Sequence, residues 1–84
     1  MNYSLQIKES AFKELQRIDK PQRLRIIEAI ETLPAQPLAG KPLKGDLSGL
    51  RRLRVGDYRV VYEVIDQQVL ILIVRIAHRK AVYR

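Results

Sequence analysis

The chain has 84 residues, no cysteine, one histidine and a formal net charge of +7. This length predicts a single domain over residues 1–84 with a modest core, and the composition argues against disulfides and a catalytic metal site. No stretch supplies the ~18 apolar residues of a membrane helix, and the N-terminus lacks the pattern of a signal peptide. We therefore expect a cytoplasmic protein that uses no cofactor.

The first half of the chain predicts a strand followed by two helices. Apolar and polar residues alternate over 3–8, which is typical of a half-buried strand. Ser10 is a suitable N-cap for a helix that begins after it, and Pro21 suits the first turn of a second helix. Both helices carry apolar residues at helical spacing, namely Ala11, Leu15 and Ile18 in the first and Ile26, Ile30 and Leu33 in the second.

The second half predicts a loop and three strands. Residues 34–49 contain three prolines and three glycines, a composition typical of a loop. Strands are expected at 50–55, 58–65 and 69–76. Residues 69–74 are all apolar, which indicates a central strand covered on both faces. We predict an α+β fold of order β-α-α-β-β-β, with a helical hairpin on a mainly antiparallel four-stranded sheet whose first strand lies parallel to the last.

Arginines are concentrated around a tight turn expected at Gly56-Asp57. Residues two apart on a strand share a face, so Arg52 and Arg54 project together, and Arg59 follows just beyond the turn. Seven of the nine basic side chains in residues 43–84 are arginines, the side chain best suited to bidentate phosphate recognition. The pattern favours a nucleic-acid partner, although a merely solvated basic surface is the simpler alternative.

Several short motifs occur in a characteristic order: Lys41-Pro-Leu-Lys-Gly45, Arg52-Leu-Arg54, Gly56-Asp-Tyr-Arg-Val-Val-Tyr62, and His78-Arg79 with Val82-Tyr-Arg84. With this spacing the chain resembles the RelE family of bacterial toxins from type II toxin–antitoxin systems, within the RelE/ParE superfamily. The resemblance implies a ribosome-dependent endonuclease, an mRNA interferase that cuts mRNA in the ribosomal A site. It also implies a RelB-like antitoxin as partner, and a toxin–antitoxin complex that binds operator DNA.

The same resemblance implies which residues are catalytic. Position by position, the active residues of the family fall on Arg52, Arg54, Arg59, Arg79 and Tyr83. The best-known members have lysine at the first two positions, and a lysine with a lowered pKa can transfer a proton. Arginine stays protonated. Arg52 and Arg54 can therefore stabilise negative charge but are poor bases.

Two further candidates concern proton transfer. His78 is the only histidine, and histidine is the side chain that ordinarily titrates near neutral pH, so it can serve as general base or acid. A structural or solvent-facing histidine is the alternative. Tyr83 can stack on a base, orient the 2′-hydroxyl or act as a base, or else pack on the sheet. More distant RNA or ribosome contacts are expected from Lys41, Lys44, Arg51 and Lys80.

Two other functions remain open at this point. One is a ParE-like toxin that poisons DNA gyrase by binding to it, although members of that branch generally lack the full arginine and tyrosine set. The other is a catalytically inactive nucleic-acid-binding relative. The arginines at positions 52 and 54 keep this last alternative open.

Overall fold

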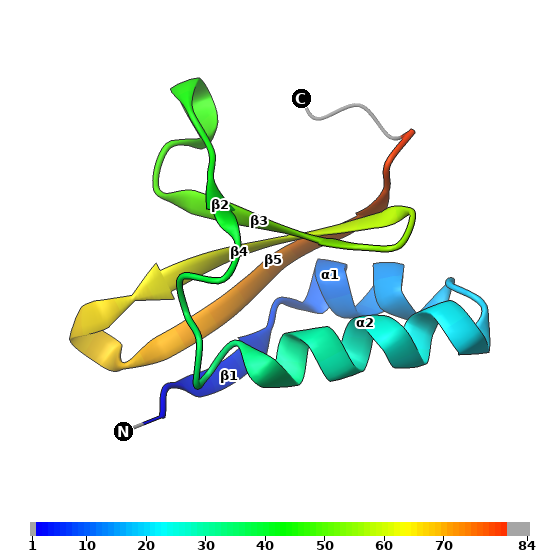
Figure 1. Cartoon of the computed structure of the whole chain (residues 1–84), viewed down its shortest axis with the longest axis horizontal. Coiled ribbons are helices and arrows are strands. Elements are labelled where there is room, and N and C mark those ends of the chain that lie inside the picture. Colours follow the sequence, from blue (N-terminus) through cyan, green and yellow to red (C-terminus); the bar gives the residue numbers. More distant parts are fainter. Residues whose placement is uncertain (1, 81–84) are drawn as a thin grey trace.

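Two α-helices cover one face of a five-stranded sheet in the computed structural model, which describes residues 2–80 (Figure 1). The helices are α1 (Glu9–Gln16) and α2 (Lys20–Thr32). The strands are β1 (Ser4–Ile7), β2 (Lys41–Pro42), β3 (Leu50–Val55), β4 (Tyr58–Ile65) and β5 (Leu70–His78), and 3₁₀ turns span Gly45–Leu47 and Asp66–Gln68. Neither helix in residues 2–80 is long and apolar enough to cross a membrane.

The spatial order of the strands is β1-β5-β4-β3-β2. β1 lies parallel to β5, and the other neighbouring pairs are antiparallel. The predicted α+β architecture is confirmed, including an inner position for β5 and the tight turn between β3 and β4. The prediction that β5 is covered on both faces was wrong, because within residues 2–80 the helices lie on one face of the sheet only. The antiparallel pairs follow one another along the chain, so short turns suffice to join them.

The fifth strand, β2, was not expected, because it lies within the segment predicted as a loop. Its two residues pair with β3, Lys41 opposite Arg52 and Pro42 opposite Arg51. A strand of two residues is too short to show an alternation of apolar and polar residues in the sequence. The prediction of four strands was therefore wrong by one short edge strand.

The predicted N-cap of the first helix was also wrong. α1 begins at Glu9, Lys8 occupies the cap position without a side-chain hydrogen bond, and Ser10 lies inside the first turn. β1 ends at Ile7, and the Lys8 N–H still bonds to the Ile73 carbonyl at 2.9 Å. The chain must therefore turn into the helix at once, before Ser10 can act as a cap.

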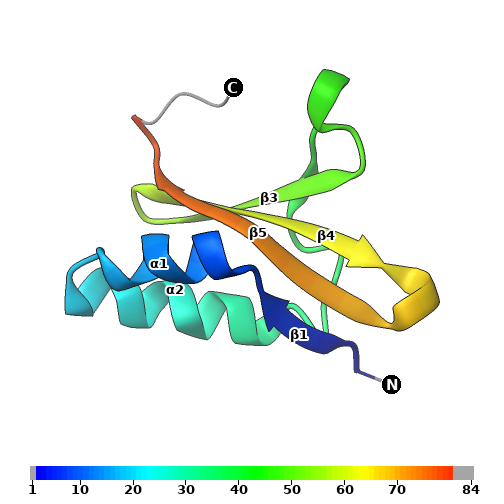
Figure 2. The same cartoon turned by 180° about the vertical axis from the view of Figure 1, so that it is seen from behind.

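The core lies between the helices and the sheet. The apolar stripes predicted for both helices are buried against one face of β4 and β5. On the strands the core consists of Val60, Tyr62, Ile71, Ile73 and Ile76. The opposite face of the sheet carries no α-helix in the part of the chain that the structure describes (Figure 2).

A β-bulge in β5 decides which side chains reach each face. Tyr62 pairs with Ile73 and Val61 pairs with Arg75, so Val74 is an extra residue between the two pairs. A bulge reverses the alternation of faces beyond it. Ile73 and Ile76 therefore both lie in the core, and the side chain of Arg75 belongs to the opposite face.

Candidate functional site

Basic side chains gather on the face of the sheet that is opposite to α1 and α2. Residues paired directly across neighbouring strands share a face. One row across the sheet is Lys41, Arg52, Val61 and Arg75, and the next row is Arg54, Arg59 and Ala77. We call the surface formed by Lys41, Arg52, Arg54, Arg59 and Arg79 the basic face.

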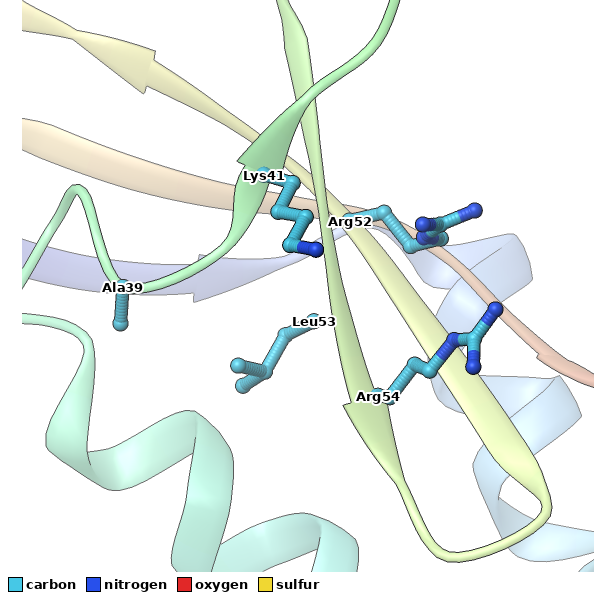
Figure 3. Close-up of a pocket in the computed structure, with 5 residues that line it drawn as sticks. All are labelled: Ala39, Lys41, Arg52, Leu53 and Arg54. Atoms are coloured by element: carbon cyan, nitrogen blue, oxygen red, sulfur yellow. The ribbon is translucent and has the colours of Figure 1, made fainter.

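A first hollow of about 270 Å³ lies beside β3 where β2 begins. Its lining consists of Ala39, Lys41, Arg52, Leu53 and Arg54. Figure 3 shows the guanidinium groups of Arg52 and Arg54 on the same side of β3, with Leu53 pointing the other way. Their shared direction confirms the alternation predicted for this strand. Three cationic groups at one hollow attract an anion.

A second hollow of about 160 Å³ lies beside the turn between β3 and β4. It is lined by Arg54, Gly56, Tyr58, Arg59 and Arg79. Arg54 lines both hollows, so the two adjoin. The arginines that the sequence placed on separate strands are thus brought together at two neighbouring depressions.

Arg79 is held at the second hollow by the residue that makes the turn. Its backbone N–H donates to the Asp57 carbonyl at 2.6 Å, and its Nε lies 3.6 Å from Asp57 Oδ1. Both side chains are about 60% exposed, at 62% and 60%, so the ion pair contributes little to stability. Its effect is to orient the guanidinium group of Arg79.

Arg54 and Arg59 lie directly opposite each other on β3 and β4. Like charges in such a pair destabilise a sheet. Arg59 is half-buried on an inner strand, whereas Arg54 is exposed. A bound anion between the two side chains would turn this repulsion into attraction.

His78 is not brought to the basic face. It pairs with Tyr58, and the two rings make an edge-to-face contact at 5.2 Å. Ile76, two residues earlier, lies in the core, so the side chain of His78 belongs to the helix side of the sheet. Its Nδ1 accepts a hydrogen bond from the Lys80 N–H at 3.2 Å. The neutral ring therefore carries its proton on Nε2.

The other predicted residues are scattered. Arg51 pairs with Tyr62 and so belongs to the helix side, where its guanidinium donates to the Gly40 carbonyl at 2.6 Å. Lys44 is exposed between β2 and the 3₁₀ turn, and Lys80 is exposed just after β5. Tyr83 lies outside the described residues.

Arg75 and its partner Glu14 were not predicted from the sequence. Arg75 belongs to the row of Lys41 and Arg52, and its Nε lies 3.7 Å from Glu14 Oε2 on α1. The signal that could have revealed Arg75 is a single charge inside an otherwise apolar strand.

Within residues 2–80 no group of three or more His, Cys, Asp or Glu side chains is arranged to hold a metal ion.

Comparison with known proteins gives the class of the chain. Residues 5–83 match the family model described as the ParE toxin of type II toxin–antitoxin systems, parDE. Toxin RelE of Mycobacterium tuberculosis is 38% identical over 98% of this chain and 87% of its own length. Toxin RelG of the same organism is 31% identical over 100% of this chain and 99% of its own length.

Solved structures agree with this match. The RelBE2 toxin–antitoxin complex from Mycobacterium tuberculosis superposes with a TM-score of 0.88 at 28% identity, covering 94% of this chain and 100% of the matched chain. The RelE–RelB complex of Pyrococcus horikoshii gives a TM-score of 0.78 at 30% identity, with 98% and 100% coverage. The matches define a toxin of type II toxin–antitoxin systems, and within that class the chain belongs to the RelE family of the RelE/ParE superfamily.

Proposed function

We propose that this toxin is a ribosome-dependent endonuclease that cuts mRNA in the ribosomal A site. One observation carries the proposal: guanidinium groups from β3, from β4 and from Arg79 just after β5 line two hollows that share Arg54. Guanidinium groups match the geometry of phosphate oxygens. Two neighbouring hollows that share Arg54 suit a backbone in which one phosphate follows another.

The reaction is an internal transesterification. The ribose 2′-oxygen attacks the adjacent phosphorus, the bond from phosphorus to the 5′-oxygen breaks, and a 2′,3′-cyclic phosphate and a free 5′-hydroxyl result. Negative charge builds up on the non-bridging oxygens as the fifth bond forms. Cations preorganised around those oxygens lower the barrier.

Arg59 and Arg79 are proposed to hold the scissile phosphate in the second hollow. Arg59 stands on an inner strand and Arg79 lies 3.6 Å from Asp57, so both guanidinium groups are directed to this hollow before RNA binds. Arg52 and Arg54 are proposed to stabilise charge at the neighbouring phosphate. Lys41 shares the first hollow with them, and Lys44 and Lys80 remain candidates for more distant contacts with RNA or the ribosome. Arg51 is not proposed as an RNA contact, because its guanidinium is bonded to the Gly40 carbonyl on the helix side.

Proton transfer requires a group other than these arginines, because guanidinium does not give up its proton near neutral pH. Tyr83 is proposed to orient the 2′-hydroxyl or to accept its proton. The sequence also offered His78 for proton transfer, but its side chain belongs to the helix side of the sheet and lines neither hollow, so we propose no proton-transfer role for it at the basic face.

A RelB-like antitoxin is the proposed partner of the chain. The relatives from Mycobacterium tuberculosis and Pyrococcus horikoshii were solved as complexes with antitoxin. The excess of basic side chains in residues 43–84 favours a partner with acidic segments. Binding of the toxin–antitoxin complex to operator DNA is part of the same proposal.

Primer extension on mRNA tests the proposed activity. Purified toxin, with and without bacterial ribosomes, is incubated with a translated mRNA, and the cut positions are mapped. We expect cuts within the A-site codon only when ribosomes are present. The absence of cuts on ribosome-bound mRNA would overturn the proposal.

A gyrase poison is the second candidate, because the matched family model is described as a ParE toxin. A supercoiling assay with purified gyrase distinguishes the two. Inhibition of supercoiling, together with intact mRNA in the primer-extension assay, would favour the gyrase reading. Cut mRNA with unaffected supercoiling would favour the endonuclease.

A further inference from the structure

Tyr62 is a completely buried tyrosine whose hydroxyl has two backbone partners. Its side chain lies in the core, 0% exposed. The hydroxyl donates to the Pro37 carbonyl at 2.7 Å and accepts the Gly40 N–H at 2.9 Å. One phenol thus connects the inner strand β4 to the segment that leads into β2.

Gly40 is the residue through which this connection acts. Its N–H is bonded by Tyr62, and its carbonyl accepts a hydrogen bond from the Arg51 side chain at 2.6 Å. A Cβ added at Gly40 would lie 2.7 Å from the Arg52 carbonyl and 2.9 Å from the ring and hydroxyl of Tyr62. The segment is therefore pressed against β3 and β4, and the next residue is Lys41.

Lys41 needs such an anchor. β2 has only two residues, too few to be stable by pairing alone. Lys41 lies directly opposite Arg52 and shares a hollow with Arg52 and Arg54. Like charges repel, so a Lys41 freed from its anchor would move away from the arginines into solvent.

We propose that Tyr62 is a positioning residue for the basic face: by holding residues 37–40, it keeps Lys41 at the first hollow, where Lys41 contacts a phosphate of bound RNA. This inference rests on the proposed function. Tyr62 itself is buried and touches no RNA. Arg51, predicted from sequence as an RNA contact, acts in the same anchor through the Gly40 carbonyl.

The salt dependence of RNA binding tests the proposal. Each cation that contacts a phosphate of single-stranded RNA adds about 0.7 to the slope of log K against log salt. Tyr62→Phe keeps the ring and the net charge but removes both hydrogen bonds. We expect it to reduce the slope for a fluorescein-labelled single-stranded RNA by about 0.7, as Lys41→Ala does. The double variant should equal Lys41→Ala alone.

A merely structural role would give a different pattern. Tyr62→Phe would then lower Tm without changing the slope, or its effect on the slope would add to that of Lys41→Ala. Gly40→Ala is a second charge-neutral variant, which displaces the same segment by the steric overlap described above. We expect it to reduce the slope like Tyr62→Phe. Tyr3→Phe is the matched control, because its hydroxyl bonds to Asp66 at the far end of β4 and β5, and its slope should equal that of the wild type.

The outcomes separate this inference from the proposed function. A steep wild-type slope that Tyr62→Phe and Gly40→Ala leave unchanged overturns the positioning role alone. So does a double variant whose slope is lower than that of Lys41→Ala. A wild-type chain with no binding to the labelled RNA, or with a flat slope, overturns phosphate recognition and the positioning role together.

Discussion

Val69 is held in a backbone conformation that a β-branched residue rarely adopts. Its φ is 50°, in the left-handed region, at the end of the 3₁₀ turn between β4 and β5. Two hydrogen bonds hold it there, from its own N–H to the Asp66 carbonyl and from the Ser4 N–H to its carbonyl. The side chain is 40% exposed, so only part of its apolar surface is buried to offset the strain.

Val69→Asn should stabilise the protein, because asparagine tolerates left-handed φ values. We expect a gain of about 1 kcal/mol, or roughly 4–8 °C in Tm for a domain of this size. Val69→Ala is the matched control, since it removes the apolar side chain but keeps a Cβ in the strained conformation. Thermal unfolding measures both. A Tm of Val69→Asn at or below that of Val69→Ala would contradict this explanation.

At the scale of elements, α1 closes an open edge of the sheet. β1 pairs with β5 only as far as Ile73, so beyond that point no strand among residues 2–80 lies beside this edge of β5. Glu14 Oε1 on α1 accepts the Ile76 N–H there at 2.9 Å. A carboxylate thus takes the place of a missing strand at the position where the edge would otherwise be unsatisfied.

Glu14→Ala should cost about 1–3 kcal/mol of unfolding free energy, because it leaves the Ile76 N–H without its acceptor. Glu14→Gln keeps an acceptor oxygen and should cost less. Glu9→Ala on the same helix is the control, since its exposed pair with Lys13 is worth at most about 0.5 kcal/mol. Denaturant unfolding and amide exchange at Ile76 measure the effect. Equal stability of Glu14→Ala and wild type would contradict it.

A side-chain hydrogen bond joins the residue before β1 to the turn between β4 and β5. The Tyr3 hydroxyl donates to Asp66 Oδ1 at 2.6 Å. This hydrogen bond, with smaller contributions from desolvation and the Asp66 charge, raises the pKa of Tyr3 above its usual value of 10.0. The phenol is the neutral form, so the hydrogen bond favours the protonated state.

The consequence is a loss of stability in alkali. A raised folded-state pKa contributes stability that is complete below the unfolded pKa and is lost as pH rises through the folded pKa. We expect wild type to unfold at a higher temperature than Tyr3→Phe at neutral pH, with the difference shrinking above about pH 10. Thermal unfolding across this pH range checks the sign. A difference that grows with pH would contradict it.

At the scale of the whole molecule, local sequence patterns predicted the helix and sheet layers, but they did not predict which residues form the site. The helical stripes and the alternation of β3 predicted the core and the shared direction of Arg52 and Arg54 correctly. The bulge at Val74 has no signature in a run of apolar residues, yet it puts Arg79 rather than His78 on the basic face. Without that extra residue, strand alternation would exchange the two.

The same limit applies to β2 and its anchor. A strand of two residues is defined by its partner β3, and the hydrogen bonds of Tyr62 join residues 22 and 25 positions apart. Such contacts depend on tertiary packing and leave no periodic pattern. The sequence therefore predicted the arginines of the site, but not the hydrogen bonds of Tyr62 that hold the segment before Lys41.

Arg59 on β4 and Arg79 just after β5 are proposed to act together on one phosphate. The most direct measurement is the single-turnover rate at which Arg59→Ala and Arg79→Ala cut ribosome-bound mRNA, with Arg25→Ala, an exposed change on α2, as the control. We expect each of the first two to lose about 10²–10³-fold in rate with an unchanged circular dichroism spectrum, and Arg25→Ala to cut like wild type. Cleavage at the wild-type rate by both Arg59→Ala and Arg79→Ala would contradict the claim.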